Sequence, residues 1–223
     1  MRDVLLRCDA LGKSFDGKSV FASVSLELSP GAYVLQGANG IGKSTLLRLL
    51  AGAQRPEFGE VWIDGVSLFK APVQARRGLS YVPAESPVYP FMTGSELLEF
   101  VAAVKKCPID RRTDEMVESF GVMPHSDIRF GAMSSGTQKK FLLAAAWIGD
   151  PRVLLFDEPD DNLDLAAREY LASRIRASAE HDVVLFASHD IAFVRESNAT
   201  VISMEQLVAT GSRAAATQDV AIL

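Results

Sequence analysis

Residues 37–44 combine glycine, lysine and serine at the spacing of a phosphate-binding loop, G-x-x-x-x-G-K-S. The glycines let the backbone turn sharply, so that several N–H groups can point at one anion. Lys43 offers a positive charge to the β- and γ-phosphates of a nucleotide, and the Ser44 hydroxyl is a natural ligand for Mg²⁺. A plain glycine-rich turn with a solvated lysine is the alternative. We disfavour it because strand, loop and helix patterns follow one another in the required order.

Two acidic residues, Asp157 and Glu158, follow the continuous apolar run Val153-Leu154-Leu155-Phe156. Such a run is typical of a parallel strand buried on both faces, and open α/β sheets hold their ligands at the carboxyl ends of such strands. If this strand neighbours the one before the phosphate loop, Asp157 would lie across from Lys43 and could hold Mg²⁺, directly or through water. Glu158 could then orient or deprotonate an attacking water. The alternative is a solvated acidic strand end.

His189 and Phe15 each allow two interpretations. His189 follows the apolar strand pattern of residues 183–187, where contact with a phosphate and a structural role are equally open. Phe15 precedes the hairpin signal Asp16-Gly17-Lys18. It could belong to the core or be an exposed ring that stacks on a flat base, and spacing alone favours the core.

The elements that must position these residues alternate between strands and helices. A short strand over residues 33–35 leads into the phosphate loop, and a helix over 45–51 follows it and stops at Gly52. A second helix is expected over 165–178. Further strands are expected at residues 4–8, 24–28, 60–65, 79–82, 183–187, 199–203 and 206–209. The pattern predicts an α/β fold.

A mostly helical insertion is expected between the strands at 79–82 and 153–157. After a proline-rich loop over 84–91, the capping box Thr93-Gly94-Ser95-Glu96 opens one helix, and a second runs from about Asp110 to Gly121. We therefore expect one domain, residues 1–223. Its expected parts are a core at 1–83 and 150–211, a helical subdomain at about 84–149 and a tail at 212–223.

The composition limits the possible settings and partners. Hydrophobic residues form 48 % of the 223 residues, enough for a sizeable core. The net charge of −5 argues against nucleic acid as the main partner, so none is expected. Cys8 and Cys107 are isolated, which indicates a reducing, cytoplasmic setting. Because no apolar run approaches membrane-spanning length, a membrane role would come through a partner.

The order of the motifs carries a family resemblance. The phosphate loop comes first and Met133-Ser134-Ser135-Gly136-Thr137-Gln138 follows the helical segment. Then come Asp157-Glu158, Asp161-Asn162-Leu163-Asp164 and His189. In this order the chain resembles the nucleotide-binding domain of an ATP-binding cassette (ABC) ATPase over nearly its whole length. The resemblance implies a P-loop NTPase core, in which a mixed sheet is covered by helices, with an antiparallel β subdomain at the N-terminus and an inserted helical subdomain.

The resemblance also implies a role for each matching residue. Phe15 would stack on adenine, which replaces the expectation that it lies in the core. Ser44 would bind Mg²⁺, and Asp157 would hold the metal through water. Glu158 would be the general base, His189 would touch the γ-phosphate, and Lys43 would assist both binding and catalysis. The implied ATP-binding residues are Phe15, Gly37, Ala38, Asn39, Gly40, Ile41, Gly42, Lys43, Ser44 and Thr45.

Three residues of the signature-like segment, Ser134, Ser135 and Gly136, would act on a second molecule. In the family two domains pair head to tail, and the signature of one closes over the ATP of the other. A helix expected over 135–147 would point its N-terminus at that γ-phosphate. Asp164 lies in the segment that usually couples the two sites.

Two departures from the family pattern bear on hydrolysis rate and coupling more than on ATP binding. The family has Gln after the strand at 79–82, whereas this chain has Ala84, which cannot ligate Mg²⁺. A one-residue shift would put Glu85 in its place. In the signature, Ser135 replaces the first Gly and Thr137 replaces Gln, while Gly136 is kept.

The leading hypothesis is an ATP-hydrolysing subunit that dimerises around ATP, as a homodimer or heterodimer, and powers transport through a separate membrane-spanning permease. It would be peripheral, at the cytoplasmic face of the membrane, and would dock through residues 84–100. The alternatives are a soluble or weakly hydrolysing ATP-gated interaction module, an ABC protein acting on ribosomes or DNA, and a P-loop kinase, in which the signature segment would have no role.

Overall fold

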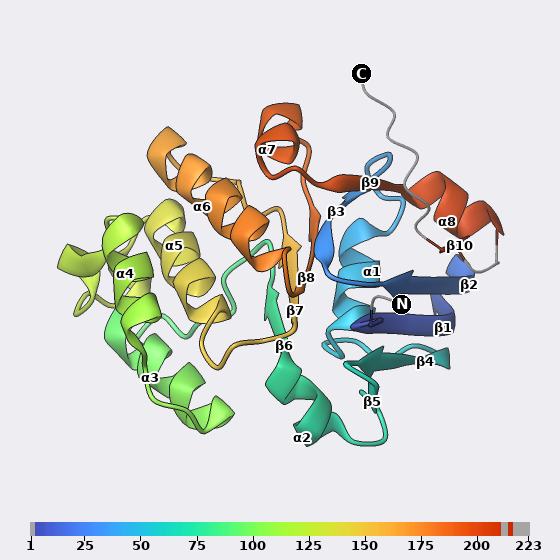
Figure 1. Cartoon of the computed structure of the whole chain (residues 1–223), viewed down its shortest axis with the longest axis horizontal. Coiled ribbons are helices and arrows are strands. Elements are labelled where there is room, and N and C mark those ends of the chain that lie inside the picture. Colours follow the sequence, from blue (N-terminus) through green and yellow to red (C-terminus); the bar gives the residue numbers. More distant parts are fainter. Residues whose placement is uncertain (1–2, 211–213, 216–223) are drawn as a thin grey trace.

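A computed structural model describes residues 3–210 and 214–215 of the chain, which form two sheets with helices around them (Figure 1). The first sheet has the order β10-β2-β1-β4-β5, and the second has the order β6-β7-β8-β3-β9. The fold is α/β, as predicted from the sequence. The expected tail at 212–223 lies outside the described residues except for 214–215.

The N-terminal sheet is mainly antiparallel, as the resemblance implied. β1 pairs with β2 and with β4, β4 pairs with β5, and only β10 adds in parallel, beside β2. The hairpin turn between β1 and β2 occurs at Asp16 and Gly17, which both have positive φ, +47° and +77°, as a tight hairpin turn requires. The strands are β1 (Leu6–Phe15), β2 (Lys18–Leu28), β4 (Phe58–Ile63), β5 (Val66–Ser67) and β10 (Ala214–Ala215).

The second sheet is parallel throughout the described residues, so the carboxyl ends of its strands meet at one edge. All residues of β7 and β8 are buried, which confirms the prediction that their apolar runs form strands buried on both faces. β8 lies between β3 and β7, so the strand before the phosphate loop and the strand before Asp157 are not neighbours. The strands are β3 (Gly31–Gln36), β6 (Leu79–Val82), β7 (Val153–Asp157), β8 (Val183–Ala187) and β9 (Thr200–Ser203).

Two cores meet at this parallel sheet. Alternate side chains of β7 point to opposite faces: Val153 and Leu155 join the core that holds α1 and the N-terminal sheet, whereas Leu154 and Phe156 join the core under α5 and α6. The helices are α1 (Lys43–Leu50), α2 (Pro72–Ala75), α3 (Gly94–Lys105), α4 (Arg111–Ser119), α5 (Ser135–Ala146), α6 (Leu165–Ser178), α7 (Ile191–Glu196) and α8 (Met204–Thr210), with 3₁₀ turns η1 (Arg76–Gly78), η2 (Met123–His125) and η3 (Phe130–Ala132).

The segment between β6 and β7 is helical, with α3 and α4 both packed on α5. The predicted capping box is present: Thr93 Oγ1 accepts from the Glu96 N–H at 3.2 Å, and Glu96 Oε2 accepts from the Thr93 N–H at 2.9 Å. Asp110 caps α4 by accepting from the Thr113 N–H at 3.0 Å. The exact division of the domain into core and subdomain stays a prediction.

The prediction of a strand at 206–209 is wrong, because these residues belong to helix α8. Met204 and Leu207 are buried at helical spacing, and Ser203 Oγ accepts from the Gln206 N–H at 3.3 Å, which starts the helix. Helices α2 and α7 were not expected from the sequence. Among residues 3–210 and 214–215, every helix is too short or too polar to span a bilayer.

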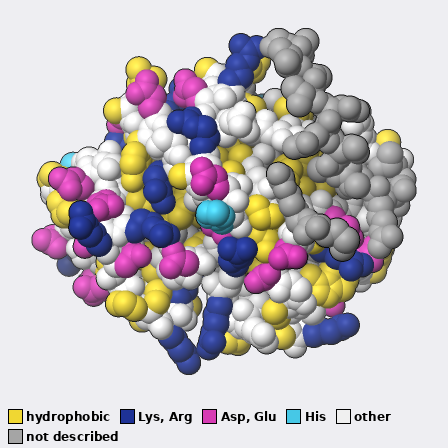
Figure 2. Space-filling model, in the orientation of Figure 1, with side chains coloured by type: hydrophobic (Ala, Val, Ile, Leu, Met, Phe, Trp, Pro, Cys, Tyr) yellow, Lys and Arg dark blue, Asp and Glu magenta, His cyan; other side chains and the backbone are white. Residues whose placement is uncertain are grey.

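Charges of both signs are interspersed with apolar side chains over the face of the molecule that Figure 2 shows. On this face, neither the acidic nor the basic side chains gather into one large patch.

Candidate active site

The phosphate loop joins the end of β3 to the start of α1, as its sequence predicted. Gly40 and Gly42 have φ values of +80° and +111°, in the region that favours glycine. A Cβ on Gly42 would also lie only 2.7 Å from the Phe21 ring. The backbone of the turn therefore favours glycine at both positions, and at Gly42 the packing against Phe21 favours it as well.

Lys43, the first residue of α1, is only 7 % exposed. Its ammonium donates to the Gly37 carbonyl at 3.0 Å, which holds the side chain across the loop. The positive charge therefore lies beside the backbone N–H groups at the start of α1, where the helix dipole already favours an anion.

Ser44 and Asp157 lie in contact, although β8 separates β7, which ends at Asp157, from β3, which leads into the loop before Ser44. Ser44 Oγ donates to Asp157 Oδ1 at 2.9 Å, while Asp157 Oδ2 is buried and has no hydrogen-bond partner within the described residues. A hydroxyl and a carboxylate with a free oxygen are ligands that Mg²⁺ accepts. The pair therefore fits a Mg²⁺ ion, and the contact arises because α1 reaches over β8 to β7.

Glu158 stands at the end of β7 with φ +48°, an uncommon conformation for a residue with a side chain. Its N–H donates to the Ala187 carbonyl at 3.0 Å, and its Oε1 lies 3.4 Å from His189 Nε2. Burial raises the pKa of Glu158; His189 opposes this rise, and the acids at 160 and 161 add to it. The structure thus brings the expected base and the expected strand-end histidine together.

The signature-like segment is open to solvent at the start of α5. Ser134 and Ser135 are exposed, and Ser134 Oγ accepts from the Thr137 N–H at 3.1 Å as the cap of the helix. Because Ser134 and Ser135 are exposed, the N-terminus of α5 is accessible from solvent. A second molecule could therefore reach it, as the in-trans role requires.

Gly136 packs directly on the segment that precedes α6. A Cβ at this position would lie 2.3 Å from the Asn162 carbonyl oxygen. Asp164, two residues further on, caps α6 by accepting from the Ala167 N–H at 2.9 Å and forms an ion pair with Lys140 of α5. The two segments assigned to the dimer contact are therefore in contact within one chain.

Replacing Gly136 by Ala is expected to lower the free energy of unfolding by about 2 kcal/mol, because the added methyl overpacks against a backbone carbonyl. At an ordinary helix position the same change would stabilise by up to about 1 kcal/mol, so the sign of the effect is diagnostic. Chemical denaturation measures it. Ser135→Ala, at the exposed neighbouring position, is the control and should change stability by less than about 0.5 kcal/mol; a stabilised Gly136→Ala variant would contradict the contact.

Phe15 is 43 % exposed at the end of β1, with the Lys13 ammonium 5.3 Å from its ring centroid. The first expectation from spacing, that Phe15 lies in the core, is wrong. Because Phe15 is the last residue of β1 and its ring is exposed, the ring is available to stack on a flat ligand.

Ala84 and Glu85 follow β6 and are both exposed. The Ala84 carbonyl is held from within by Lys139, at 2.9 Å. A role for Glu85 in place of the missing Gln stays a prediction.

Glu205 of α8 is a residue near the phosphate loop that the sequence did not indicate. Its Oε1 accepts from the Ala38 N–H at 3.1 Å. Hydrogen bonds from its own N–H and from that of Ala38 lower its pKa. Because Glu205 falls between the strands expected at 199–203 and 206–209, nothing in the sequence placed its carboxylate against the loop.

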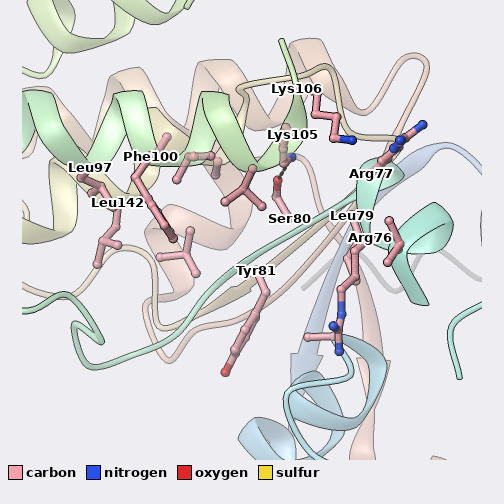
Figure 3. Close-up of a pocket in the computed structure, with 17 residues that line it drawn as sticks. Arg76, Arg77, Leu79, Ser80, Tyr81, Leu97, Phe100, Lys105, Lys106 and Leu142 are labelled. Carbon is pink, nitrogen blue, oxygen red and sulfur yellow. Dashed lines mark hydrogen bonds between the residues drawn. The ribbon is translucent and has the colours of Figure 1, made fainter. Parts of the chain in front are cut away.

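A groove of about 490 Å³ opens between α2, β6, α3 and α5 (Figure 3). Its walls are mostly apolar, with Phe100 and Leu142 from two helices directed toward the same space. Three basic residues, Arg76, Arg77 and Lys106, also line it. Lys105 donates to Ser80 Oγ at 2.7 Å, and burial lowers the pKa of Lys105 to about 8.

Residues 21–161, well over half of the chain, match the family described as ABC transporter. The chain is 31 % identical over 204 residues to a sulfate/thiosulfate import ATP-binding protein CysA of Gloeobacter violaceus, covering 89 % of this chain and 59 % of that protein. It is 32 % identical over 200 residues to an Fe(3+) ions import ATP-binding protein FbpC of Vibrio cholerae, covering 87 % and 57 %.

Solved structures show the same fold. An ATP binding subunit of an ABC transporter matches with a TM-score of 0.83 and 24 % identity, covering 94 % of this chain and 87 % of that one. A dimeric ATP-binding cassette in a post-hydrolysis state bound to ADP and Pi matches with a TM-score of 0.76 and 20 % identity, covering 89 % and 94 %. This chain spans about three fifths of the length of the two curated relatives above.

Proposed function

The chain belongs to the ABC transporter family of ATP-binding proteins, and on this basis we propose that it binds and hydrolyses ATP as a subunit that drives transport through a separate permease. The observation that carries the hydrolytic part is the contact of Ser44 with Asp157, next to the pair of Glu158 and His189. The second oxygen of Asp157 has no hydrogen-bond partner among the residues that the structure describes. Metal ligands and a base are thus gathered beside one phosphate loop.

The residues of this chain would divide the work as follows. The backbone of residues 37–45 and the Lys43 ammonium bind the phosphates, and Phe15 stacks on the adenine. Ser44 and Asp157 would hold Mg²⁺, whose chemistry is to neutralise charge on the β- and γ-phosphates. Glu158 takes a proton from the attacking water, and His189 contacts the γ-phosphate.

A second ATPase subunit would complete the site. Ser134, Ser135 and Gly136 at the start of α5 would close over the partner's ATP, with the helix N-terminus directed at its γ-phosphate. Asp164, which is tied to Lys140 of the same helix, would couple the two sites. The exposure of Ser134 and Ser135 supports this arrangement.

The permease would dock on residues 84–100 and the adjoining groove. Tyr89 and Phe91 of this stretch are exposed and stacked, with ring centroids 5.4 Å apart, and Phe100 lines the groove. Exposed apolar patches of this kind mark protein contacts. The protein would therefore be peripheral, at the cytoplasmic face of the membrane, as an import subunit like the relatives named above.

Removal of the Ser44 hydroxyl tests the hydrolytic assignment. Ser44→Ala is expected to lower Mg²⁺-dependent ATP turnover by about 10²-fold, because the metal loses a ligand and charge neutralisation at the phosphates weakens. Phosphate release with Mg²⁺ and with chelator measures it. Ser44→Thr keeps the hydroxyl and is the matched control, expected to retain most activity. Equal turnover in the Ala and Thr variants would contradict the metal assignment.

A weakly hydrolysing ATP-gated module is the second candidate, favoured by Ala84 in place of Gln. It predicts nucleotide binding with little steady-state turnover, both alone and with the permease. Measuring turnover in the two conditions therefore decides between the two functions.

A further inference from the structure

Lys139 is a buried lysine in the middle of the site, only 4 % exposed, on the helix α5 that begins with the signature-like segment. Its ammonium donates to three backbone carbonyls: Pro83 at 3.2 Å, Ala84 at 2.9 Å and Glu158 at 3.2 Å. An ammonium has three donors, so all of them are used on backbone. A lysine that only solvated a helix face would direct its ammonium to water.

The three carbonyls come from two places that the proposed function needs to hold together. Two belong to the loop after β6, where the family has Gln and this chain has Ala84. The third belongs to Glu158, the proposed base. One side chain therefore joins α5, the loop after β6 and the end of β7.

Glu158 needs such support, because its backbone has φ +48° and conformations of this kind persist only where the surroundings hold them. Its N–H donates to the Ala187 carbonyl at 3.0 Å, and its C=O accepts from the Lys139 ammonium at 3.2 Å and, more weakly, from the Asp161 N–H at 3.4 Å. Both sides of the residue are thus anchored, one to the sheet and the other to α5.

The buried ammonium of Lys139 lies near several carboxylates. Burial lowers its pKa, while the carboxylates of Asp161, Asp157, Asp160 and Glu158 oppose the change, in that order. The lysine is therefore placed among four acids that favour its positive form.

We propose that Lys139 is a positioning residue for ATP hydrolysis, which holds the backbone of Glu158 and the loop after β6 in one fixed arrangement. The proposal rests on the proposed function for its kinetic part only.

Three substitutions separate the contributions of the side chain. Lys139→Met removes all three donors, and we expect it to lower kcat for ATP by about tenfold or more, since small misplacements of a reacting group are costly. KM for ATP should stay within about twofold, because the phosphate loop is untouched. Lys139→Arg keeps charge and donors and should retain most of kcat. Lys139→Gln, which keeps two donors, should fall between them.

Hydrogen exchange without ATP tests the tether independently of hydrolysis. In Lys139→Met, amides of residues 84–92 should exchange several-fold faster than in the unaltered protein, because the Pro83 and Ala84 carbonyls are released. If the Met variant does not fold, as its thermal melt would reveal, Lys139→Gln replaces it in both measurements. Lys70→Met is the control for loss of a lysine: Lys70 is 80 % exposed, near Glu60, and its variant should match the unaltered protein.

Glu158→Gln, measured alongside, separates failure of the proposed ATPase function from failure of the positioning role of Lys139. If it hydrolyses ATP as fast as the unaltered protein, the proposed function fails, while the exchange result still decides on the tether. The proposal for Lys139 is overturned if Lys139→Met keeps kcat and leaves loop exchange unchanged. It is equally overturned if Arg and Met lower kcat to the same extent, or if the loss appears in KM alone.

Discussion

Replacing Glu158 by Gln is expected to lower ATP turnover by about 10²- to 10⁴-fold, the range found when a general base is removed. Gln has the same shape as Glu and keeps the backbone contacts at Ala187 and Lys139, but its amide cannot take a proton from water. ATP binding should remain within about twofold, because the phosphate loop is unaltered. The variant should therefore accumulate as a dimer with ATP, visible by size-exclusion chromatography with and without nucleotide.

Glu169→Gln is the matched control for the loss of one carboxylate. Glu169 is exposed on α6, away from the strand end, and its variant should hydrolyse ATP normally and remain unaltered in its assembly. Unchanged turnover in Glu158→Gln would refute the assignment of the base. A large loss without an ATP-dependent dimer would keep the base and count against closure of two subunits around ATP.

The parts of the site that the sequence predicted well have local causes. The phosphate loop is specified by glycines whose backbone angles other residues rarely adopt, at Gly40 and Gly42. The buried strands β7 and β8 are specified by unbroken apolar runs, and the start of α3 by the Thr93 capping box. Each signal lies within a few residues of the feature it determines.

The parts that the sequence did not predict depend on pairings between distant segments. No local pattern shows that β8 separates β3 from β7, or that Lys139 reaches carbonyls 55 and 56 residues before it. Helix α8 was mistaken for a strand because its run of apolar residues is too short for periodicity to decide. The contact of Glu205 with the phosphate loop was therefore not predicted either. Its carboxylate accepts from the Ala38 N–H, 167 residues earlier in the chain.

Mixing two inactive variants is expected to restore activity if each subunit completes the other's site. One variant is Lys43→Ala, which loses the charge for the phosphates. The other is Ser134→Asp, which places a negative charge against the partner's γ-phosphate. Aspartate caps helices as well as serine does. Its carboxylate can accept from the Thr137 N–H in place of the Ser134 hydroxyl, so α5 should stay folded. Each variant alone should lose most of its turnover, by about 10²-fold.

In a mixed dimer the two defects fall on the same site, because the loop of one subunit faces the signature of the other. The second site then combines an intact loop with an intact signature. With random pairing, about half of the dimers are mixed and each has one intact site, so an equal mixture should recover about a quarter of the unaltered turnover. The recovery assumes that the two sites hydrolyse independently, and strict coupling through Asp164 would lower it. Phosphate release from the mixture measures this recovery.

Ser134→Asn is the control, because Asn caps the helix without adding charge. It should be far more active alone than Ser134→Asp, since repulsion and not a lost cap causes the defect. If the mixture shows no recovery while cross-linking confirms mixed dimers, then either Ser134 acts on its own subunit's ATP or one defective site silences both. A mixture of Lys43→Ala with the unaltered protein separates these, because only the second explanation predicts less than half of the unaltered turnover per mixed dimer.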